Sequence, residues 1–479
     1  MRNLSRHRNC TTTLARQRAK DIDVDRSHLS RRPLAAACFL LFAASAEMAL
    51  AAPLPINNCG DTGSGSLRAS VASAATGETV TIPSNLGCNT IVLATAIPIP
   101  VTSLTIAGPG ADAMSVVHSG VTADRVFYHQ GTGTFTIQSL SVMLGNPTAT
   151  SGNVQGGCIL SNGQVTLKSS VVSQCIARGT VDASAMGGGV FAHSVTVKYS
   201  TLSENEARAP VFARGGAIYT QTLTAKYDNI VRNGAYSSGA SFEGAGGGLY
   251  LADTSTILSS NISFNRTSGD AGGISEFARD ATTSLTIKNS TISNNYAGHT
   301  VGGVYSGASL TLHNSTIAFN RAAQDYTGTY HHAPGLSIEV GGYAITADLK
   351  SSILSNNTYG LIDDDFSTIS FADETITVSG DHNLIYANFS TTPLPSGTVH
   401  LKCPLLGSLR DNGGPTQTLA LLSRSPAIDA GSNPDVQTYD QRQSPFARMS
   451  GTLPDIGAYE VQQDDIVFNS NLEGCPVLF

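Results

Sequence analysis

The sequence of 479 residues contains no tryptophan, and charged residues make up only 13% of it. With 41% hydrophobic residues, so low a charge excludes an intrinsically disordered chain, which needs many charges and little apolar surface. The formal net charge of −7 argues against a nucleic-acid partner, which needs a basic face. No apolar run reaches the roughly 18 residues of a membrane-spanning helix. We therefore expect neither nucleic-acid binding nor a membrane-spanning segment in the mature chain.

Motifs for metals and nucleotides are also missing. The sequence has no C-x-x-C pair and no His/Cys cluster with zinc spacing. It has no GxxxxGK[ST], no HExxH and no Rossmann signature between a strand and a helix. These absences lead us to expect no bound metal and no cofactor.

The N-terminal segment has the pattern of an export signal. Arg31 and Arg32 precede the apolar segment 34–45, and a small-residue A-x-A site ends at Ala51. This order predicts a signal peptide with a long n-region over residues 1–51. A short buried helix is the alternative. We expect a mature protein that is extracellular or attached to the cell surface.

The cysteines fit an exported protein. Six of the eight follow the expected cleavage site: Cys59, Cys88, Cys158, Cys175, Cys403 and Cys475. An even number in an exported chain indicates disulfides. Nearness in the sequence favours the pairs Cys59–Cys88 and Cys403–Cys475. Cys158 and Cys175 either pair with each other or are buried thiols.

One block of about eleven residues recurs seven times, with a mean step near 30 residues. Its copies end at Cys175, Asn205, Asn233, Asn265, Asn295, Asn320 and Asn357. A second marker, Gly-Gly followed by a small or apolar residue, has a similar period and begins at Gly156, Gly187, Gly215, Gly246, Gly272 and Gly302. A fixed period of this length is typical of a solenoid.

The residues inside each block alternate between apolar and polar. Leu285 and Ile287 would point to one side, with Thr286 and Lys288 on the other. A period of two predicts strands, so the repeat predicts an all-β parallel β-helix with two or three short strands in each coil. Equivalent residues of successive coils should stack, and we expect one apolar stack made of Ile230, Ile262, Ile292, Ile317 and Leu354.

The asparagines that end the blocks are predicted to form a ladder. Six coils supply it, through Asn205, Asn233, Asn265, Asn295, Asn320 and Asn357. We expect these residues to adopt the left-handed conformation of a sharp corner and their amides to bond along the stack. Ligand binding by these amides is the alternative. Cys175 at the same position indicates an end of the ladder.

The two ends of the chain differ from the repeat. Residues 57–103 are expected to form an N-terminal cap, in which Leu67, Val71 and Ala74 have the spacing of a helix. The coils should span residues 104–400. Residues 405–460 differ in composition and should form a C-terminal region. Residues 461–479 would then be a tail.

Three motifs of the C-terminal region carry a family resemblance. "DNGGPTQT" from Asp411, "SPAIDAG" from Ser425 and "DIGAYE" from Asp455 resemble the choice-of-anchor Q domain of exported bacterial β-helix proteins. "GGAI" from Gly215 and the pair Phe264-Asn265 resemble polymorphic outer-membrane protein repeats. The resemblance implies a right-handed parallel β-helix, a pectate-lyase-like solenoid with an N-terminal cap and a C-terminal cap region, that is secreted or displayed on the surface. It implies no single activity.

Two segments are candidates for binding. Asp363, Asp364 and Asp365 are adjacent acids of the kind that could hold calcium or do acid–base work, although we favour a solvated acidic loop. His331 and His332 lie in a long insertion, where a solenoid often carries its binding residues. Two adjacent histidines without a pattern of acids are more often part of a polar loop.

The sequence therefore predicts a monomeric, non-catalytic adhesin or carbohydrate- and surface-interaction protein. Its partner would be a polysaccharide or another cell-surface component. A polysaccharide lyase or glycoside hydrolase with a pectin-lyase-like fold is the alternative, because the sites of β-helix enzymes assemble from different coils and leave little trace in the sequence.

Overall fold

The computed structural model describes residues 52–239, 243–323, 332–371, 374–388, 393–463 and 465. These residues belong to one compact unit, Leu50–Phe479. The expected signal peptide, His331 and Cys475 lie outside the described residues. So does most of the expected tail after residue 460.

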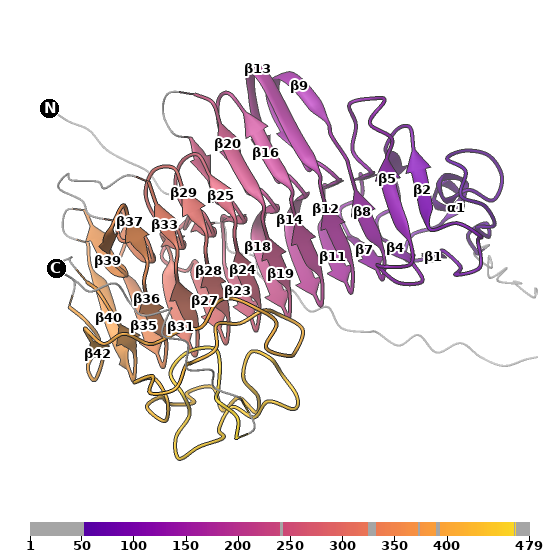
Figure 1. Ribbon diagram of the computed structural model, residues 1–479. Coiled ribbons are helices and arrows are strands. Elements are labelled where there is room, and N and C mark those ends of the chain that lie inside the picture. Colours follow the sequence, from indigo (N-terminus) through magenta and orange to yellow (C-terminus); the bar gives the residue numbers. More distant parts are fainter. Residues whose placement is uncertain are drawn as a thin grey trace, which may run out of the picture. The chain divides into compact units, whose positions relative to one another are not determined.

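Strands of successive coils pair in parallel along three sheets, here called A, B and C (Figure 1). Sheet B takes one strand from each coil: β2 (Thr90–Leu93), β5 (Ser115–His118), β8 (Ser141–Met143), β12 (Val171–Ser173), β15 (Thr201–Ser203), β19 (Asn229–Val231), β24 (Asn261–Ser263), β28 (Thr291–Ser293), β32 (Thr316–Ala318), β36 (Ile353–Ser355), β41 (Leu384–Ile385) and β42 (Val399–His400). A parallel β-helix is therefore the fold of this unit, as the repeat predicted.

Sheet C follows sheet B in each coil. It contains β9 (Thr148–Gln155), β13 (Ile176–Met186), β16 (Glu206–Ala209), β17 (Ala213–Arg214), β20 (Gly234–Ser237), β21 (Gly244–Ala245), β25 (Arg266–Thr267), β29 (Tyr296–Ala297), β33 (Arg321–Ala322), β37 (Thr358–Tyr359) and β38 (Ile362–Asp363). Only the last pair, β37 with β38, is antiparallel among the strand pairs of the described residues.

Sheet A closes each coil and has two strand positions per coil in most of the helix. Its strands are β1 (Thr79–Thr81), β3 (Ile97–Ile99), β4 (Leu104–Ala107), β6 (Phe127–His129), β7 (Thr134–Gln138), β10 (Ile159–Ser161), β11 (Gln164–Lys168), β14 (Val190–Lys198), β18 (Ile218–Lys226), β22 (Leu249–Leu251), β23 (Ser255–Leu258), β26 (Ile274–Glu276), β27 (Ser284–Lys288), β30 (Val304–Ser306), β31 (Ser309–His313), β34 (Leu336–Val340), β35 (Ile345–Lys350), β39 (Phe366–Ser370) and β40 (Ile376–Asp381).

The predicted apolar stack is confirmed. The register of sheet B places Ile230, Ile262, Ile292, Ile317 and Leu354 on successive strands, and each is fully buried. Every second side chain of a strand points into the coil, so the stacks from the three sheets merge into one apolar core that runs through the helix.

The asparagine ladder is present and runs through six coils. Each Nδ2 donates to the Oδ1 of the asparagine in the next coil at 2.9–3.0 Å, from Asn205 to Asn357. The expected left-handed conformation was assigned to the wrong residue. It belongs to the residue before each ladder position, such as Arg232, Phe264 and Asn294, with φ of 57–58°. The buried asparagines are there for their hydrogen bonds, because each amide supplies both a donor and an acceptor.

A second ladder lies at the corner between sheets A and B. The backbone N–H of one coil donates to a side-chain oxygen of the next, as Ser260 does to Ser290 and Ser290 to Ser315. Asp228 takes one place in this ladder, where its Oδ1 accepts from the Ser200 N–H at 2.8 Å. Burial raises the pKa of Asp228 to about 7.

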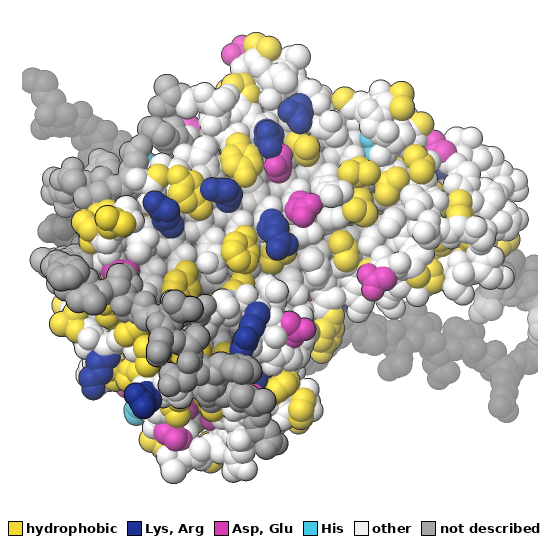
Figure 2. Space-filling model, in the orientation of Figure 1, with side chains coloured by type: hydrophobic (Ala, Val, Ile, Leu, Met, Phe, Trp, Pro, Cys, Tyr) yellow, Lys and Arg dark blue, Asp and Glu magenta, His cyan; other side chains and the backbone are white. Residues whose placement is uncertain are grey.

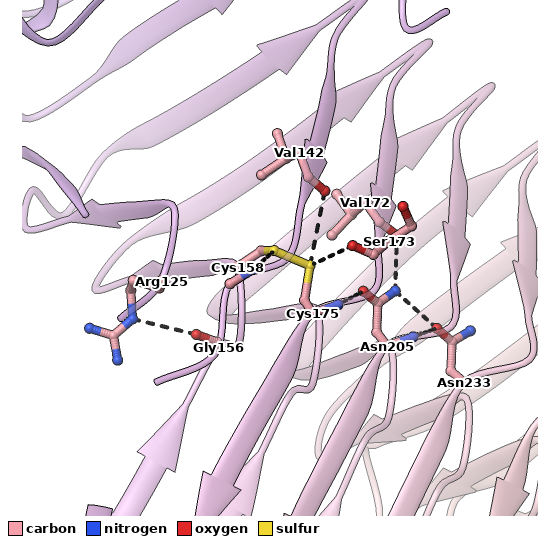
Figure 3. Close-up of a disulfide and its surroundings, with 10 residues drawn as sticks. Arg125, Val142, Gly156, Cys158, Val172, Ser173, Cys175, Asn205 and Asn233 are labelled. Atoms are coloured by element: carbon pink, nitrogen blue, oxygen red, sulfur yellow. Dashed lines mark hydrogen bonds between the residues drawn. A yellow bond between two sulfur atoms is a disulfide. The ribbon is translucent and has the colours of Figure 1, made fainter. Parts of the chain in front are cut away.

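Disulfides occur near the start of the helix. Cys59 pairs with Cys88 in the N-terminal cap, whose expected helix is α1 (Leu67–Ser73). Cys158 pairs with Cys175, which settles the open alternative for these two residues. Figure 3 shows this bond at the end of the asparagine ladder, where the Cys175 N–H donates to the Asn205 side chain at 3.2 Å. Cys403 is also disulfide-bonded, and its expected partner Cys475 lies outside the described residues.

The region 405–460 packs against the outer face of sheet B, beside the coils that contain β19 to β36 (Figure 1). We expected a cap across the end of the helix. The structure differs because the outer face of the later coils carries apolar side chains beside polar ones that hydrogen-bond to the region. Ala318, Ile353 and Leu384 pack there against apolar residues of the region, among them Leu419 and Ile456. The region contains no named strand, and it forms only isolated bridges within the described residues.

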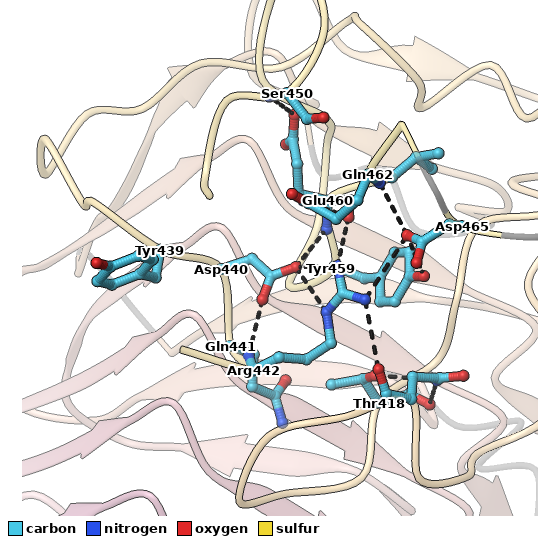
Figure 4. Close-up of polar contacts among 12 residues, drawn as sticks. Thr418, Tyr439, Asp440, Gln441, Arg442, Ser450, Tyr459, Glu460, Gln462 and Asp465 are labelled. Carbon is cyan, nitrogen blue, oxygen red and sulfur yellow. Dashed lines mark hydrogen bonds and ion pairs between the residues drawn. The ribbon is translucent and has the colours of Figure 1, made fainter. Parts of the chain in front are cut away.

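Buried charges organise this C-terminal region. Arg442 is fully buried and pairs with Asp440 at 2.7 Å (Figure 4). Its guanidinium lies 3.9 Å from the Phe446 ring centre and 3.8 Å from the Tyr459 ring centre. A planar guanidinium can stack and form two hydrogen bonds at once, which an ammonium cannot. No helix in the described part of the chain is long and apolar enough to cross a membrane.

Candidate functional site

The three adjacent aspartates do not form a solvated loop, and that prediction was wrong. Asp363, Asp364 and Asp365 are at most 1% exposed. The Asp365 Oδ1 accepts hydrogen bonds from the Asn357 N–H at 3.0 Å and from the Asn357 Nδ2 at 2.7 Å. Its Oδ2 accepts from the Ala387 N–H at 2.7 Å. Asp365 therefore continues the asparagine ladder, and burial raises its pKa to about 7.

Asp363 is equally out of reach of a ligand. It ends β38, and its buried Oδ1 has no hydrogen-bond partner among the described residues. Burial raises its pKa to about 6. This burial could not be predicted from the sequence, because the coil from β39 to β41, which covers the three acids, departs from the repeated block. Asp365 stabilises the late coils through its hydrogen bonds, whereas the buried Oδ1 of Asp363 costs free energy.

A pocket of about 340 Å³ lies instead at the corner where sheet C passes into sheet A. Residues from several coils line it: Arg214, Glu243, Gly244, Ala245, Asp270, Ser275, Phe277, His299, Thr300, Tyr305, His332 and Glu339. His332 was a predicted candidate and belongs to this lining. Three acids line the pocket with it: Glu243 and Asp270, which lie far from His332 in the sequence, and Glu339, which lies near it.

The strands of sheet A direct two of these side chains outward. Tyr305 stands between the fully buried Val304 and Ser306 on β30. Glu339 stands between the buried Ile338 and Val340 on β34. Because strand side chains alternate between faces, Tyr305 and Glu339 point away from the core and towards the pocket. Asp270 lies in the turn before β26 and forms an isolated bridge with Ala245.

Asp270 is held through one of its two oxygens. The Oδ1 lies 2.8 Å from the His299 Nδ1 and accepts from the Thr300 N–H at 2.9 Å and the Thr300 hydroxyl at 2.6 Å. The Oδ2 has no hydrogen bond within the described part of the chain. Burial acts to raise the pKa of Asp270, but the hydrogen bonds from His299 and Thr300 outweigh it and lower the pKa. The same contact raises the pKa of His299.

Glu339 has the opposite environment. Burial raises its pKa, a hydrogen bond with Tyr305 opposes the shift, and the charge of Asp270 adds to it. The His332 Nε2 lies 3.7 Å from the Glu339 Oε2, and its Nδ1 lies 3.1 Å from the Ser337 hydroxyl. Burial also raises the pKa of Tyr305, so its hydroxyl stays protonated and can donate to Glu339.

The pocket therefore holds two carboxyl groups whose environments shift their pKa values in opposite directions. This is the arrangement that lets one carboxyl act as an acid while a second stays ionised. The described residues contain no group of three or more His, Cys, Asp or Glu side chains that could hold a metal ion. Acid–base chemistry by side chains is what this arrangement can provide.

A row of aromatic rings on sheet A runs into the pocket. Phe191, Tyr219, Tyr250, Phe277 and Tyr305 follow one another with ring centres 4.9–5.6 Å apart. Most of these rings stack face to face, so their faces cover each other and their edges point outward. The row stiffens the wall of the pocket and offers no open stacking platform along its length. Phe277, 46% exposed, is the ring most open to solvent in the row.

Sequence reasoning missed Asp270, Tyr305 and Glu339. Asp270 lies just before a Gly-Gly marker, and Glu339 lies in a strand that follows the insertion. Each is a single residue of a different coil, so no local spacing connects them. The insertion itself was the usable signal, since it identified His332.

Comparisons with known proteins add little to this geometry. No protein-family model and no curated protein sequence matches the chain. Among solved structures, the crystal structure of pectate lyase Pel9A is similar over 85% of this chain and 96% of that chain, with 13% sequence identity and a TM-score of 0.41. A similarity this distant carries no argument about activity. The resemblance to choice-of-anchor Q domains and to polymorphic outer-membrane protein repeats stays a prediction.

Proposed function

We propose that this protein binds a glycan in the pocket at the corner of sheets C and A and hydrolyses a glycosidic bond there. One observation carries the proposal: Asp270 and Glu339 line the same pocket, and their surroundings lower the pKa of the first and raise that of the second. Glycoside hydrolysis uses a pair of carboxyl groups that differ in this way.

Each carboxyl group then has one role. Glu339 donates its proton to the glycosidic oxygen as the bond from that oxygen to the anomeric carbon breaks. The open Oδ2 of Asp270 accepts a proton from the water that forms the new bond to the anomeric carbon. Tyr305 and His332 position Glu339, and His299 and Thr300 position Asp270.

The charges of the pocket favour an uncharged glycan. Glu243, Asp270 and Glu339 line it together with a single arginine, Arg214. Arg214 packs over the Tyr250 ring at 5.1 Å and the Phe212 ring at 4.5 Å, which holds it at the wall. With Glu339 protonated, as its role requires, Glu243 and Asp270 stay as negative charges against Arg214, and the charge of a protonated His299 lies 2.8 Å from Asp270. An acidic sugar would therefore meet no net positive charge at this point.

We also propose that the protein acts outside the cytoplasm. Two disulfides support this, Cys59–Cys88 and Cys158–Cys175, because such bonds persist in oxidising compartments. Mass spectrometry of the secreted protein tests the proposal. A chain that begins near Ala52 is expected, and an intact Met1 in a cytoplasmic fraction would contradict export.

Glycan binding without turnover is the second candidate function. The three hydrogen bonds on the Asp270 Oδ1 favour it, because Asp270 would need the same bonds if its role were only to hold the turn in place. In that case the pocket would still take a sugar, and neither carboxyl group would transfer a proton.

The experiment is a hydrolysis screen with purified mature protein. Neutral and acidic polysaccharides are incubated with and without calcium, and new reducing ends and unsaturated products are measured. We expect reducing ends from a neutral polysaccharide, no dependence on calcium, and loss of activity in Glu339→Gln and Asp270→Asn. Glu204→Gln, an acid outside the pocket whose Oε2 accepts from the Gln174 side chain at the surface, is the matched control and should keep activity. Unsaturated products would indicate a lyase, and binding without products would indicate the second candidate.

A further inference from the structure

We infer that sheet C carries a second binding site, separate from the pocket, for an acidic polysaccharide. The site is a row of side chains on the outer face of six successive coils: Arg178, Arg208, Tyr236, Arg266, Tyr296 and Arg321. We call it the arginine–tyrosine row. It would anchor the protein to a negatively charged glycan layer.

The register of sheet C places these residues at two outward-facing strand positions that lie two residues apart. Arg178 of β13 pairs with Arg208 of β16, and Arg208 pairs with Tyr236 of β20. Arg266 of β25, Tyr296 of β29 and Arg321 of β33 share the second position, which is that of Gly234 on β20, two residues before Tyr236. Figure 2 shows basic side chains interleaved with apolar ones and with a few acidic ones across this face, over the strands from β13 to β33. Each coil contributes one arginine or one tyrosine to the row.

Aromatic rings hold the guanidinium groups in place. The Arg208 guanidinium lies 5.2 Å from the Tyr236 ring centre, and that of Arg266 lies 5.0 Å from the Tyr296 ring centre. Such contacts orient a side chain without neutralising its charge. Arg178, Arg266 and Arg321 have no ion pair within the described part of the chain, whereas Arg208 is paired with Glu206 at 2.8 Å. Three of the four positive charges are thus available to a ligand.

The spacing of the row suits a long, regular polymer. Neighbouring strands lie about 4.8 Å apart, so Arg266 and Arg321, two strands apart, recur after about 10 Å. That is comparable to the length of a disaccharide in an extended chain, so an acidic group on every second sugar would meet an arginine. A shallow pocket of about 340 Å³ at one end of the row, lined by Arg178, Arg208 and Tyr236, gives room for a sugar ring.

The geometry favours a polysaccharide over a nucleic acid. Single-stranded nucleic acid binds by stacking its bases on open aromatic faces. Here the guanidinium groups of Arg208 and Arg266 already lie over the faces of Tyr236 and Tyr296. What remains open is a line of cationic groups and phenol hydroxyls, which fits carboxylate or sulfate groups and sugar hydroxyls.

The test is a binding measurement on the whole mature protein. The probes are polygalacturonate for carboxylate groups, dextran sulfate for sulfate groups, dextran as the neutral control and a thymidine oligonucleotide as the nucleic acid. The variant is Arg266→Ala combined with Arg321→Ala. Arg279→Ala is the matched control, because Arg279 is 55% exposed and lies outside the row.

We expect at least one of the two acidic polysaccharides to bind, with an affinity that falls as salt is added. The double variant should bind about tenfold more weakly or worse, and Arg279→Ala should bind as the unchanged protein does. Hydrolysis in the pocket should be the same in all three proteins. Failure of both acidic polysaccharides to bind, equal binding by the double variant, or binding of the oligonucleotide alone would overturn the inference.

Discussion

Replacing Asn265 by alanine tests the asparagine ladder at its centre. The Asn265 Oδ1 accepts from the Asn233 N–H at 2.9 Å and the Asn233 Nδ2 at 3.0 Å. Its Nδ2 donates to the Ile230 carbonyl at 2.9 Å and to the Asn295 Oδ1 at 3.0 Å. The side chain is fully buried, so water cannot reach the groups that lose their hydrogen-bond partner when it is removed.

The expected loss follows from these contacts. Asn265→Ala removes four hydrogen bonds and leaves the buried Asn233 N–H without its acceptor. The Asn233 Nδ2 keeps the Leu202 and Val231 carbonyls, so its loss is partial. With about 0.5–1.5 kcal/mol for each net hydrogen bond and about 1–3 kcal/mol for an orphaned buried group, we expect the free energy of unfolding to fall by at least about 3 kcal/mol.

The assay is urea unfolding followed by far-ultraviolet circular dichroism, with the free energy taken from the linear dependence on urea. Asn162→Ala is the control, because Asn162 is exposed and its Nδ2 donates only to the Gln130 carbonyl at 3.2 Å. It should change the free energy of unfolding by less than about 1 kcal/mol. Equal effects of the two substitutions would refute the reasoning about the ladder.

Three further predictions concern other buried groups. Replacing Cys158 and Cys175 by serine should lower the free energy of unfolding by about 3 kcal/mol, as expected for a loop of this length; no difference from the unchanged protein under oxidising conditions would contradict this. Burial raises the pKa of Glu276 from 4.5 to about 9, and neither of its oxygens has a partner among the described residues. The folded state therefore holds a proton that the unfolded state releases. The stability of the folded state is highest below about pH 4.5, where both states bind this proton, and it decreases as pH rises towards 9. The melting temperature should fall across that range and fall less in Glu276→Gln, whereas parallel curves would contradict the assignment. Arg442→Met should destabilise the region 405–460 by about 3–5 kcal/mol, because it leaves Asp440 buried without its partner; limited proteolysis of that region measures it, and unchanged resistance would speak against the pair.

The repeat was sufficient to predict the fold. The alternation within each block defined the strands, and the fixed step placed Ile262 above Ile230 and Asn265 above Asn233. It could not show which residue turns the corner, because the left-handed conformation falls on residues as different as Arg232 and Phe264. At that position the stack itself imposes the backbone conformation on whichever residue is present.

The candidate site could not be predicted in the same way. The three aspartates from Asp363 attracted attention because they are adjacent, yet a coil without the repeated block buries them. Asp270 and Glu339 are single acids separated by the insertion that follows Ala322. Only the stacking of coils brings them to one pocket. There the burial of Glu339 raises its pKa, and the hydrogen bonds from His299 and Thr300 lower that of Asp270.

The most direct test of this account is a titration of the two pocket carboxyl groups by carbon-13 nuclear magnetic resonance. The Glu339→Gln and Asp270→Asn variants assign the two signals. We predict that Asp270 titrates below its ordinary value of 3.8 and Glu339 above its ordinary value of 4.5. Titration of both groups at their ordinary values, or in the reverse order, would contradict the acid and base roles proposed for them.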